Sequence, residues 1–234
     1  LPRISGGRIP AVEIMNKDGS LNEKAGKYKG MRAKEAREAV INDMEKTGRI
    51  EKIEMIENVV NVHERCDTEI EILMTEQWFI RYLDLRKHFL KAGKQMNWHP
   101  KHMKNRYDNW VKGLKWDWCI SRQRNFGIPI PVWHCKKCKE IILPDENELP
   151  IDPIIDKPKK PCKCGSKEFV GEKDTLDTWA TSALTPQIAA ELFRGKKIYD
   201  KLYPMSLRPQ AHDIITFWLF NTVVKSQLHN NINP

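Results

Sequence analysis

The stretch Cys135-x-x-Cys138, followed after 23 residues by Cys162-x-Cys164-Gly165, decides how the middle of the chain folds. Zinc binds four thiolates in a tetrahedron, and cysteine pairs on tight turns supply two ligands each. We therefore expect one zinc ion on these four cysteines. Because protein would fill all four positions, the zinc should be structural, with no position left for water. The alternatives are four unrelated thiols or a redox Cys-x-x-Cys motif, but no βαβ pattern surrounds it.

The other two cysteines do not extend this site. His63 and Cys66 have the spacing of half a knuckle, but no second pair lies nearby, so no metal is assigned to them. Cys119 lies among tryptophans and is predicted to be a small core residue. Since the chain has six cysteines and no secretory signal, we expect a reducing compartment rather than a disulfide framework.

The composition is that of a globular protein with a core. Of the 234 residues, 40% are hydrophobic and 30% are charged, and no apolar run approaches the roughly 18 residues of a membrane span. The sequence begins at Leu1 without an initiator Met and ends at Pro234 without a helix stop signal. We therefore expect it to be a piece of a longer protein.

Positive charge is concentrated in residues 81–125. This segment carries twelve Lys and Arg against three Asp, which equals the net charge of +9 of the whole chain. It is also rich in aromatic residues, among them Trp98, Tyr107, Trp110, Trp116 and Trp118. A basic segment rich in aromatics indicates a polyanionic partner, with nucleic acid as the first candidate. A solvated helix face is the alternative.

Apolar periodicity predicts four main helices. They are expected over residues 33–47 with Gly48 after the end, over 78–92 with Gly93 as the stop, from Pro100 to residue 114, and over 212–228. The third helix should bury the stripe Met103, Tyr107, Trp110, Val111 and Leu114. The fourth is apolar nearly all round and should be buried.

Short strands are expected elsewhere. Residues 50–62, 70–73 and 205–207 are candidates, and residues 1–30 should hold one or two strands with a turn at Lys17-Asp18-Gly19.

Three further segments combine polar and aromatic residues: 118–129, 174–184 and 208–215. In the first, Phe126 precedes Gly127, and a glycine there suggests backbone pressed close to a ligand. The third joins a predicted strand to a helix, which is where open α/β sheets bind ligands. Each segment alone is equally typical of caps and turns.

Together and in this order, the segments resemble the valyl-tRNA synthetases, class I aminoacyl-tRNA ligases, in their archaeal form. WCISRQ at 118–123 is similar to that family's segment of the same sequence, DTLDTWATS at 174–182 to DVLDTWFTS, and AHDII at 211–215 to GYDII. The isoleucyl enzymes differ at the last two places. GKYKG at 26–30 resembles the exit of an inserted editing domain, and EQWF at 76–79 the return to the catalytic domain. The resemblance covers essentially the whole chain.

The resemblance implies an α/β fold, namely the second half of a Rossmann-type catalytic domain with an inserted zinc ribbon, preceded by the C-terminal part of an editing domain. The implied boundaries are 1–74 for the editing part, 75–134 for return helices and a catalytic segment, 135–170 for the ribbon, and 171–234 for a catalytic segment ending before the KMSKS loop. The family's HIGH and KMSKS signatures are not in this sequence. No catalytic residue is therefore expected in it, and the piece alone should be inactive.

The resemblance also implies binding residues. Phe126 and Trp179 should line the valine pocket, with Phe126 standing where the family usually has Trp. Asp213, His212 and Ala211 should contact ATP and the adenylate, with Asp213 accepting hydrogen bonds from the ribose and Ala211 replacing the family's Gly. The expected tRNA contacts are Lys101, Lys104, Lys112 and Arg122.

The implied activity of the longer protein is valine–tRNA ligation. It would activate valine with ATP and Mg²⁺ to valyl-adenylate, transfer valine to tRNA(Val), and edit misacylated tRNA, as a cytoplasmic monomer that contacts no membrane. The zinc would then hold residues 122–126 and 174–179 in register. The main alternative is a free-standing zinc-ribbon RNA-binding module. A zinc-dependent hydrolase is a weaker one, because the zinc site is closed.

Overall fold

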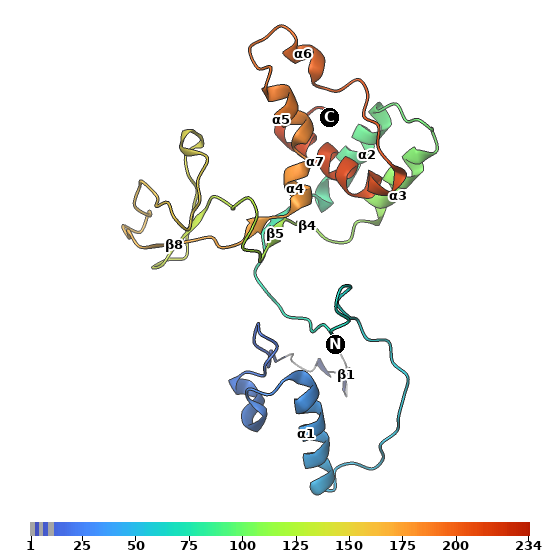
Figure 1. Cartoon of the computed structure of the whole chain (residues 1–234), viewed down its shortest axis with the longest axis vertical. Helices are drawn as coiled ribbons and strands as arrows, with labels where there is room; N and C mark the ends of the chain where they lie inside the picture. Colours follow the sequence, from blue (N-terminus) through green and yellow to red (C-terminus); the bar gives the residue numbers. More distant parts are fainter. Residues whose placement is uncertain (1–2, 5–6, 9–11) are drawn as a thin grey trace. The chain divides into compact units, whose positions relative to one another are not determined.

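A computed structural model of the chain describes residues 3–4, 7–8 and 12–234 (Figure 1). It has two compact units, Leu1–Glu76 and Gln77–Pro234. The expected mixture of helices and strands is confirmed. The predicted boundary after residue 74 lies two residues before this division, and the assignment of the segments to editing and catalytic domains remains a prediction.

The elements are short. The α-helices are α1 (Ala33–Lys46), α2 (Arg86–Gln95), α3 (Met103–Gly113), α4 (Thr178–Ser182), α5 (Thr185–Glu191), α6 (Tyr199–Leu202) and α7 (Trp218–Asn230). The 3₁₀ helices are η1 (Glu23–Tyr28), η2 (Leu83–Leu85), η3 (Glu146–Glu148) and η4 (His212–Thr216). The strands are β1 (Arg3–Ile4), β2 (Gly7–Arg8), β3 (Phe79–Ile80), β4 (Trp118–Cys119), β5 (Ser121–Arg122), β6 (Trp133–Cys135), β7 (Ile141–Ile142), β8 (Phe169–Gly171) and β9 (Thr175–Leu176).

In the first unit, helix α1 confirms the prediction for residues 33–47. The Glu35 carboxylate accepts from the Arg32 N–H, and Gly48 follows the helix with a left-handed φ of 63°. Of the segment predicted as strands within residues 1–30, positions 1–2, 5–6 and 9–11 lie outside the described residues. The predicted turn is present, since the Gly19 N–H donates to the Asn16 carbonyl.

The strands expected at 50–62 and 70–73 are wrong. These residues are extended, but within the described chain they pair only through an isolated bridge between Val62 and Glu69. A β-strand needs a neighbouring strand to satisfy its backbone groups, and alternating apolar residues alone do not supply one. The apolar side chains accordingly stay in solvent, with Met55 97% and Ile72 91% exposed.

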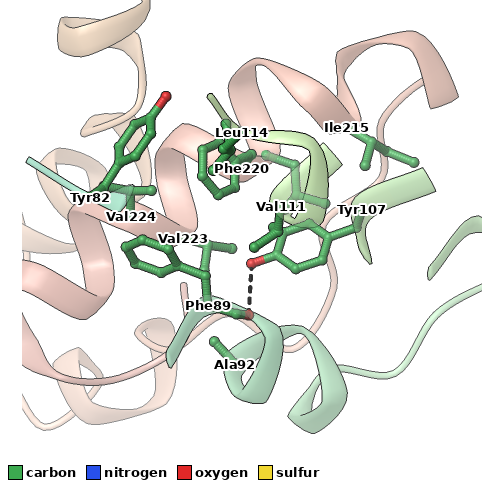
Figure 2. Close-up of a cluster of buried hydrophobic side chains, with 11 residues drawn as sticks. Tyr82, Phe89, Ala92, Tyr107, Val111, Leu114, Ile215, Phe220, Val223 and Val224 are labelled. Carbon is green, nitrogen blue, oxygen red and sulfur yellow. Dashed lines mark hydrogen bonds between the residues drawn. The ribbon is translucent and has the colours of Figure 1, made fainter. Parts of the chain in front are cut away.

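The core of the second unit joins α2, α3, η4 and α7 (Figure 2). Phe220 meets Phe89 edge-on, with ring centroids 5.7 Å apart, and Tyr82 at 5.6 Å. Tyr107 is fully buried and donates its hydroxyl to the Phe89 carbonyl at 3.0 Å, and burial raises its pKa. Of the predicted stripe on α3, Tyr107, Val111 and Leu114 are buried, while Met103 and Trp110 are partly buried against them.

The predicted helix over residues 78–92 is partly wrong. Its first residues form β3, which pairs with β4, and the helix begins only at Arg86. Between them, the Asp117 carboxylate accepts from the N–H groups of Tyr82 and Leu83, which lie 35 and 34 residues away, so periodicity does not reveal these contacts. These hydrogen bonds hold the pKa of Asp117 below its ordinary value.

Gly93 is not the stop of α2. It lies inside the helix, and a Cβ there would be 2.4 Å from the Tyr107 ring. The glycine is therefore needed for the close approach of α2 to α3. The actual end, at Gln95, is followed by extended backbone at Met96.

The predicted helix over 212–228 is confirmed with one break. The backbone of Phe217 (φ −113°, ψ −88°) separates η4 from α7, and most of α7 is buried as predicted.

The strand expected at 205–207 is wrong, because it has no ladder partner among the described residues. All strand pairs among the described residues are antiparallel. The parallel sheet of a Rossmann-type domain therefore remains a prediction. In the same residues no helix is long and apolar enough to cross a membrane.

We predict that Gly93→Ala lowers the free energy of unfolding by about 1–3 kcal/mol, because the added methyl group overlaps Tyr107 in a filled core. Gly113→Ala is the matched control, since a Cβ at this helical glycine would meet nothing within 4 Å. Urea unfolding of both variants measures the difference. Equal midpoints for the two would contradict the packing argument.

Candidate functional site

The four cysteines lie at one end of a small three-stranded antiparallel sheet of order β7-β6-β8. Cys135 is the last residue of β6 and pairs with Phe169 of β8. Each cysteine pair closes a tight turn. The Lys139 N–H donates to the Cys135 carbonyl at 2.9 Å, and the Gly165 N–H to the Cys162 carbonyl at 2.8 Å. Lys139 and Gly165 both have positive φ, which is why Gly suits the second turn.

The geometry fits one zinc ion. All four Sγ atoms lie within 4.8 Å of one another, and the pairs Cys135–Cys164 and Cys138–Cys162 are 3.6 and 3.5 Å apart. A tetrahedral zinc with bonds of about 2.3 Å places its sulfur ligands roughly 3.8 Å apart. Two ligands are buried and two are exposed, and the protein alone can fill the coordination sphere.

Backbone amides prepare this cluster for negative charge. N–H groups of Cys138 and Lys137 lower the pKa of Cys135 to about 6, although burial opposes them. The Glu140 amide lowers the pKa of Cys138, but hydrogen bonds with the other three cysteines, together with burial, outweigh it and raise that pKa to about 12. A thiolate at Cys135 therefore makes deprotonation of Cys138 less favourable. A bound dication would offset the repulsion between the two negative charges.

The segments before and after the ribbon are paired. Strand β5 pairs with β9 in the register Ser121↔Leu176 and Arg122↔Thr175. Arg122 Nη2 lies 3.2 Å from Oδ1 of the buried Asp177, and Gln123 Nε2 donates to Asp174 Oδ2 at 2.7 Å. Two motifs about 50 residues apart thus form one layer, from which the ribbon departs and to which it returns.

Glu172 joins the base of the ribbon to this layer. Its Oε2 accepts from Trp78 Nε1 at 2.8 Å and is 3.1 Å from His134 Nε2, while Oε1 accepts from the amides of Lys173 and Asp174. Burial raises the pKa of this carboxyl, but the hydrogen bonds outweigh it and hold the pKa below its ordinary value. Sequence reasoning missed Glu172, because nothing in its neighbourhood distinguishes it from a surface glutamate.

Gln77 was also missed. Its Oε1 accepts from Ser121 Oγ at 2.8 Å and from Gln123 Nε2 at 3.1 Å, and the Ser121 hydroxyl in turn accepts from the Trp78 amide. The signal available in the sequence was the EQWF resemblance at 76–79, which identified the segment but not this contact.

The predicted valine-pocket residues are accessible. Phe126 is 96% exposed, and Trp179 is 40% exposed and stacks on Phe217 with centroids 5.8 Å apart. The stack joins the Asp174–Ser182 motif to the segment that carries Asp213. Phe217 was expected only as a helix residue. Within the described residues, no ring contact joins Phe126 to Trp179.

Gly127 has a packing role that the sequence did not reveal. A Cβ at Gly127 would lie 2.7 Å from the Thr175 side chain, so its bare backbone is needed to pack against β9. The close approach of this backbone to a ligand stays a prediction. The bridge between Pro129 and Thr175 continues this contact.

Some of the residues predicted to bind nucleotide or tRNA are exposed, and others are engaged in ion pairs within the chain. Ala211, His212 and Asp213 are exposed at the start of η4. Lys101 and Lys112 are exposed near the two ends of α3. Lys104 pairs with Asp108, and Arg122 is held by Asp177 and by the carbonyls of Ser121 and Cys119. Binding by all of these residues remains a prediction.

Comparison with known proteins identifies a matching family and several similar proteins. The family tRNA synthetases class I (I, L, M and V) matches residues 8–234. Valine–tRNA ligase of Thermoplasma volcanium is 49% identical over 97% of the chain, and that of Methanocaldococcus jannaschii 46% identical over 94%. The chain spans only 28% and 25% of the length of these two proteins.

We predict that the unsubstituted protein binds one zinc per chain and that Cys162→Ser lowers the zinc content to near zero, because three ligands and a weak hydroxyl do not replace four thiolates. Cys119→Ser is the control, since Cys119 lies outside the cluster. Elemental analysis after dialysis checks both. Full zinc retention in Cys162→Ser would refute the ligand assignment.

Proposed function

Since the chain belongs to the class I tRNA synthetases for I, L, M and V, we propose that it is part of a valine–tRNA ligase. Such an enzyme activates valine with ATP to valyl-adenylate and transfers the valine to its tRNA. The observation that carries the proposal is the 44–49% identity to archaeal valine–tRNA ligases along nearly the whole chain. The alternative of a free-standing RNA-binding module has no comparable support.

The architecture is proposed on the same basis. Residues 1–74 are the end of an editing domain, 75–134 and 171–234 are segments of a Rossmann-type catalytic domain, and 135–170 are a zinc ribbon between them. The fit of four sulfur atoms to one tetrahedral zinc supports the ribbon assignment. Zinc supplies cross-linking here rather than chemistry, because all four ligands come from the protein.

Phe126 and Trp179 form walls of the valine pocket. An apolar pocket separates valine from the larger isoleucine by size, but it rejects the isosteric threonine only by about 100-fold. That limit accounts for an editing activity in the longer protein. The stack of Trp179 on Phe217 supports the assignment, because it fixes one wall beside the nucleotide segment.

The adenosine lies near the start of η4. The exposed Asp213 carboxylate accepts hydrogen bonds from the ribose hydroxyls, and His212 and Ala211 lie beside the nucleotide. The groups that neutralise phosphate charge during activation, with Mg²⁺, belong to signatures outside this sequence. The chain alone therefore carries recognition and no catalytic residue.

The partner macromolecule is tRNA(Val). Lysines 87, 91 and 94 on α2 and Lys101 and Lys112 on or beside α3 are exposed, while the apolar faces of these helices fill the core. Phosphate contacts from such a surface give affinity without reading the sequence. We place the enzyme in the cytoplasm as a monomer.

We predict valine-dependent ATP–pyrophosphate exchange for the polypeptide that carries this chain, and none for residues 1–234 alone. In the longer protein, Trp179→Ala should lower kcat/KM for valine at least tenfold and narrow the preference over isoleucine, because the pocket loses a wall. Trp116→Ala, at a tryptophan that is 72% exposed and outside the pocket, is the control. Exchange with another amino acid in place of valine would refute the proposal.

We predict that reversing the charge of Lys101, Lys104 and Lys112 together weakens tRNA binding and lowers the slope of log Kd against log salt by about 2–3, since each phosphate contact contributes about 0.7–0.9. The control reverses Lys173, Lys197 and Lys201, which are exposed elsewhere. Filter binding over a salt series measures both. Superimposable salt curves for the two variants would exclude this surface.

A further inference from the structure

A hollow of about 530 Å³ lies on the ribbon, and none of the residues assigned to valine or ATP lines it. Its walls come from β6, β8 and the loop 153–161 that leads to Cys162. Neither the zinc nor the proposed aminoacylation accounts for it. The ribbon residues are drawn in yellow in Figure 1.

The loop that shapes the hollow is tied down. Trp133 Nε1 donates to the Asp156 carbonyl at 3.0 Å, and the Asp152 carboxylate accepts from the Ile154 amide at 3.0 Å. Gly171 lets the loop lie directly on β8, since a Cβ there would be 1.9 Å from the Pro153 carbonyl oxygen. The hollow is thus preformed, and a ligand need not order the loop in order to bind.

Positive charge surrounds it. Five lysines line the hollow, against one Asp and one Glu. Lys159 and Lys160 pair with Glu148 and Asp145. Lys157 and Lys167 form no ion pair within the described part of the chain, and both are exposed.

The lining favours nucleic acid over protein. Protein-binding surfaces are enriched in Arg and depleted in Lys, whereas this lining has five Lys and no Arg. An ammonium group is a compact point charge that suits a phosphate oxygen. Ile154 and Ile155, 66% and 77% exposed, add apolar surface of the kind that sugar edges can cover.

We propose that this hollow binds the phosphate backbone of the tRNA, at a contact separate from α2 and α3. The inference rests on the proposed function, because that function supplies the RNA. Lys157 and Lys167 carry the contact. The tied loop positions Lys157, and Lys167 lies two residues before β8.

The test uses the enzyme that carries this chain, with Lys157→Glu and Lys167→Glu together. At about 0.1 M salt, Kd for tRNA(Val) should rise about tenfold and the salt slope should fall by about 1.5, the share of two phosphate contacts. Valine-dependent ATP–pyrophosphate exchange and the KM for ATP should not change. Lys197→Glu with Lys201→Glu is the matched control, because it makes the same charge change at exposed sites off the hollow.

Lys157→Gln with Lys167→Gln removes charge without adding any, and should lower the salt slope to a similar extent with a smaller rise in Kd. Several outcomes would overturn the inference: a Kd equal to that of the control pair, an equal loss of exchange, or a lowered unfolding temperature with unchanged tRNA binding. The last would assign the hollow to an acidic segment of the longer protein. Absence of valine-dependent exchange in the unsubstituted enzyme would instead remove the proposed function.

Discussion

The carboxylate of Glu172 is the contact on which the arrangement around the ribbon depends. It accepts hydrogen bonds from the Trp78 indole and from the backbone amides of Lys173 and Asp174, and it lies against the His134 imidazole on β6. A half-buried carboxylate is costly unless its oxygens are satisfied, and here each oxygen has two partners. Because the partners come from three separate segments, satisfying one charged group brings all three together.

This constraint bears on what a zinc ion on the four cysteines would contribute. Strands β5 and β9 pair directly, and Arg122 meets Asp177 across them, so the layer that holds both motifs does not need the metal to close it. A zinc ion on the four cysteines would instead cross-link the far end of residues 135–170, where two of the four cysteines are exposed. Small units without a large core commonly obtain their stability from a metal. Residues 135–170 are therefore anchored at one end by hydrogen bonds, and bound zinc would cross-link the other end.

Sequence reasoning succeeded where the controlling interaction is local. Four cysteines at knuckle spacing, the α1 boundary at Gly48 and the buried stripe of α3 all follow from turn chemistry or helical period. It failed where a distant residue decides. Gly93 was taken for a helix stop because its partner, Tyr107, is not visible from its neighbours, and the packing of Gly127 on Thr175 was not foreseen for the same reason. Residues 50–62 have strand-like alternation, but no neighbouring strand completes a ladder among the described residues.

The same distinction explains why the proposed recognition residues are hard to infer from geometry alone. Phe126 is almost fully exposed, and His212 and Asp213 lie on the surface, so no packing contact reveals their use. What the fold provides is their support: Gly127 packs on Thr175 directly after Phe126, and Phe217 stacks on Trp179 four residues after Asp213. Residues that bind a substrate must leave their binding faces open, so their supports carry the structural evidence. Phe126 is supported through Gly127 by Thr175 on β9, and Trp179 itself lies on α4, so the position of this one segment bears on both proposed pocket residues.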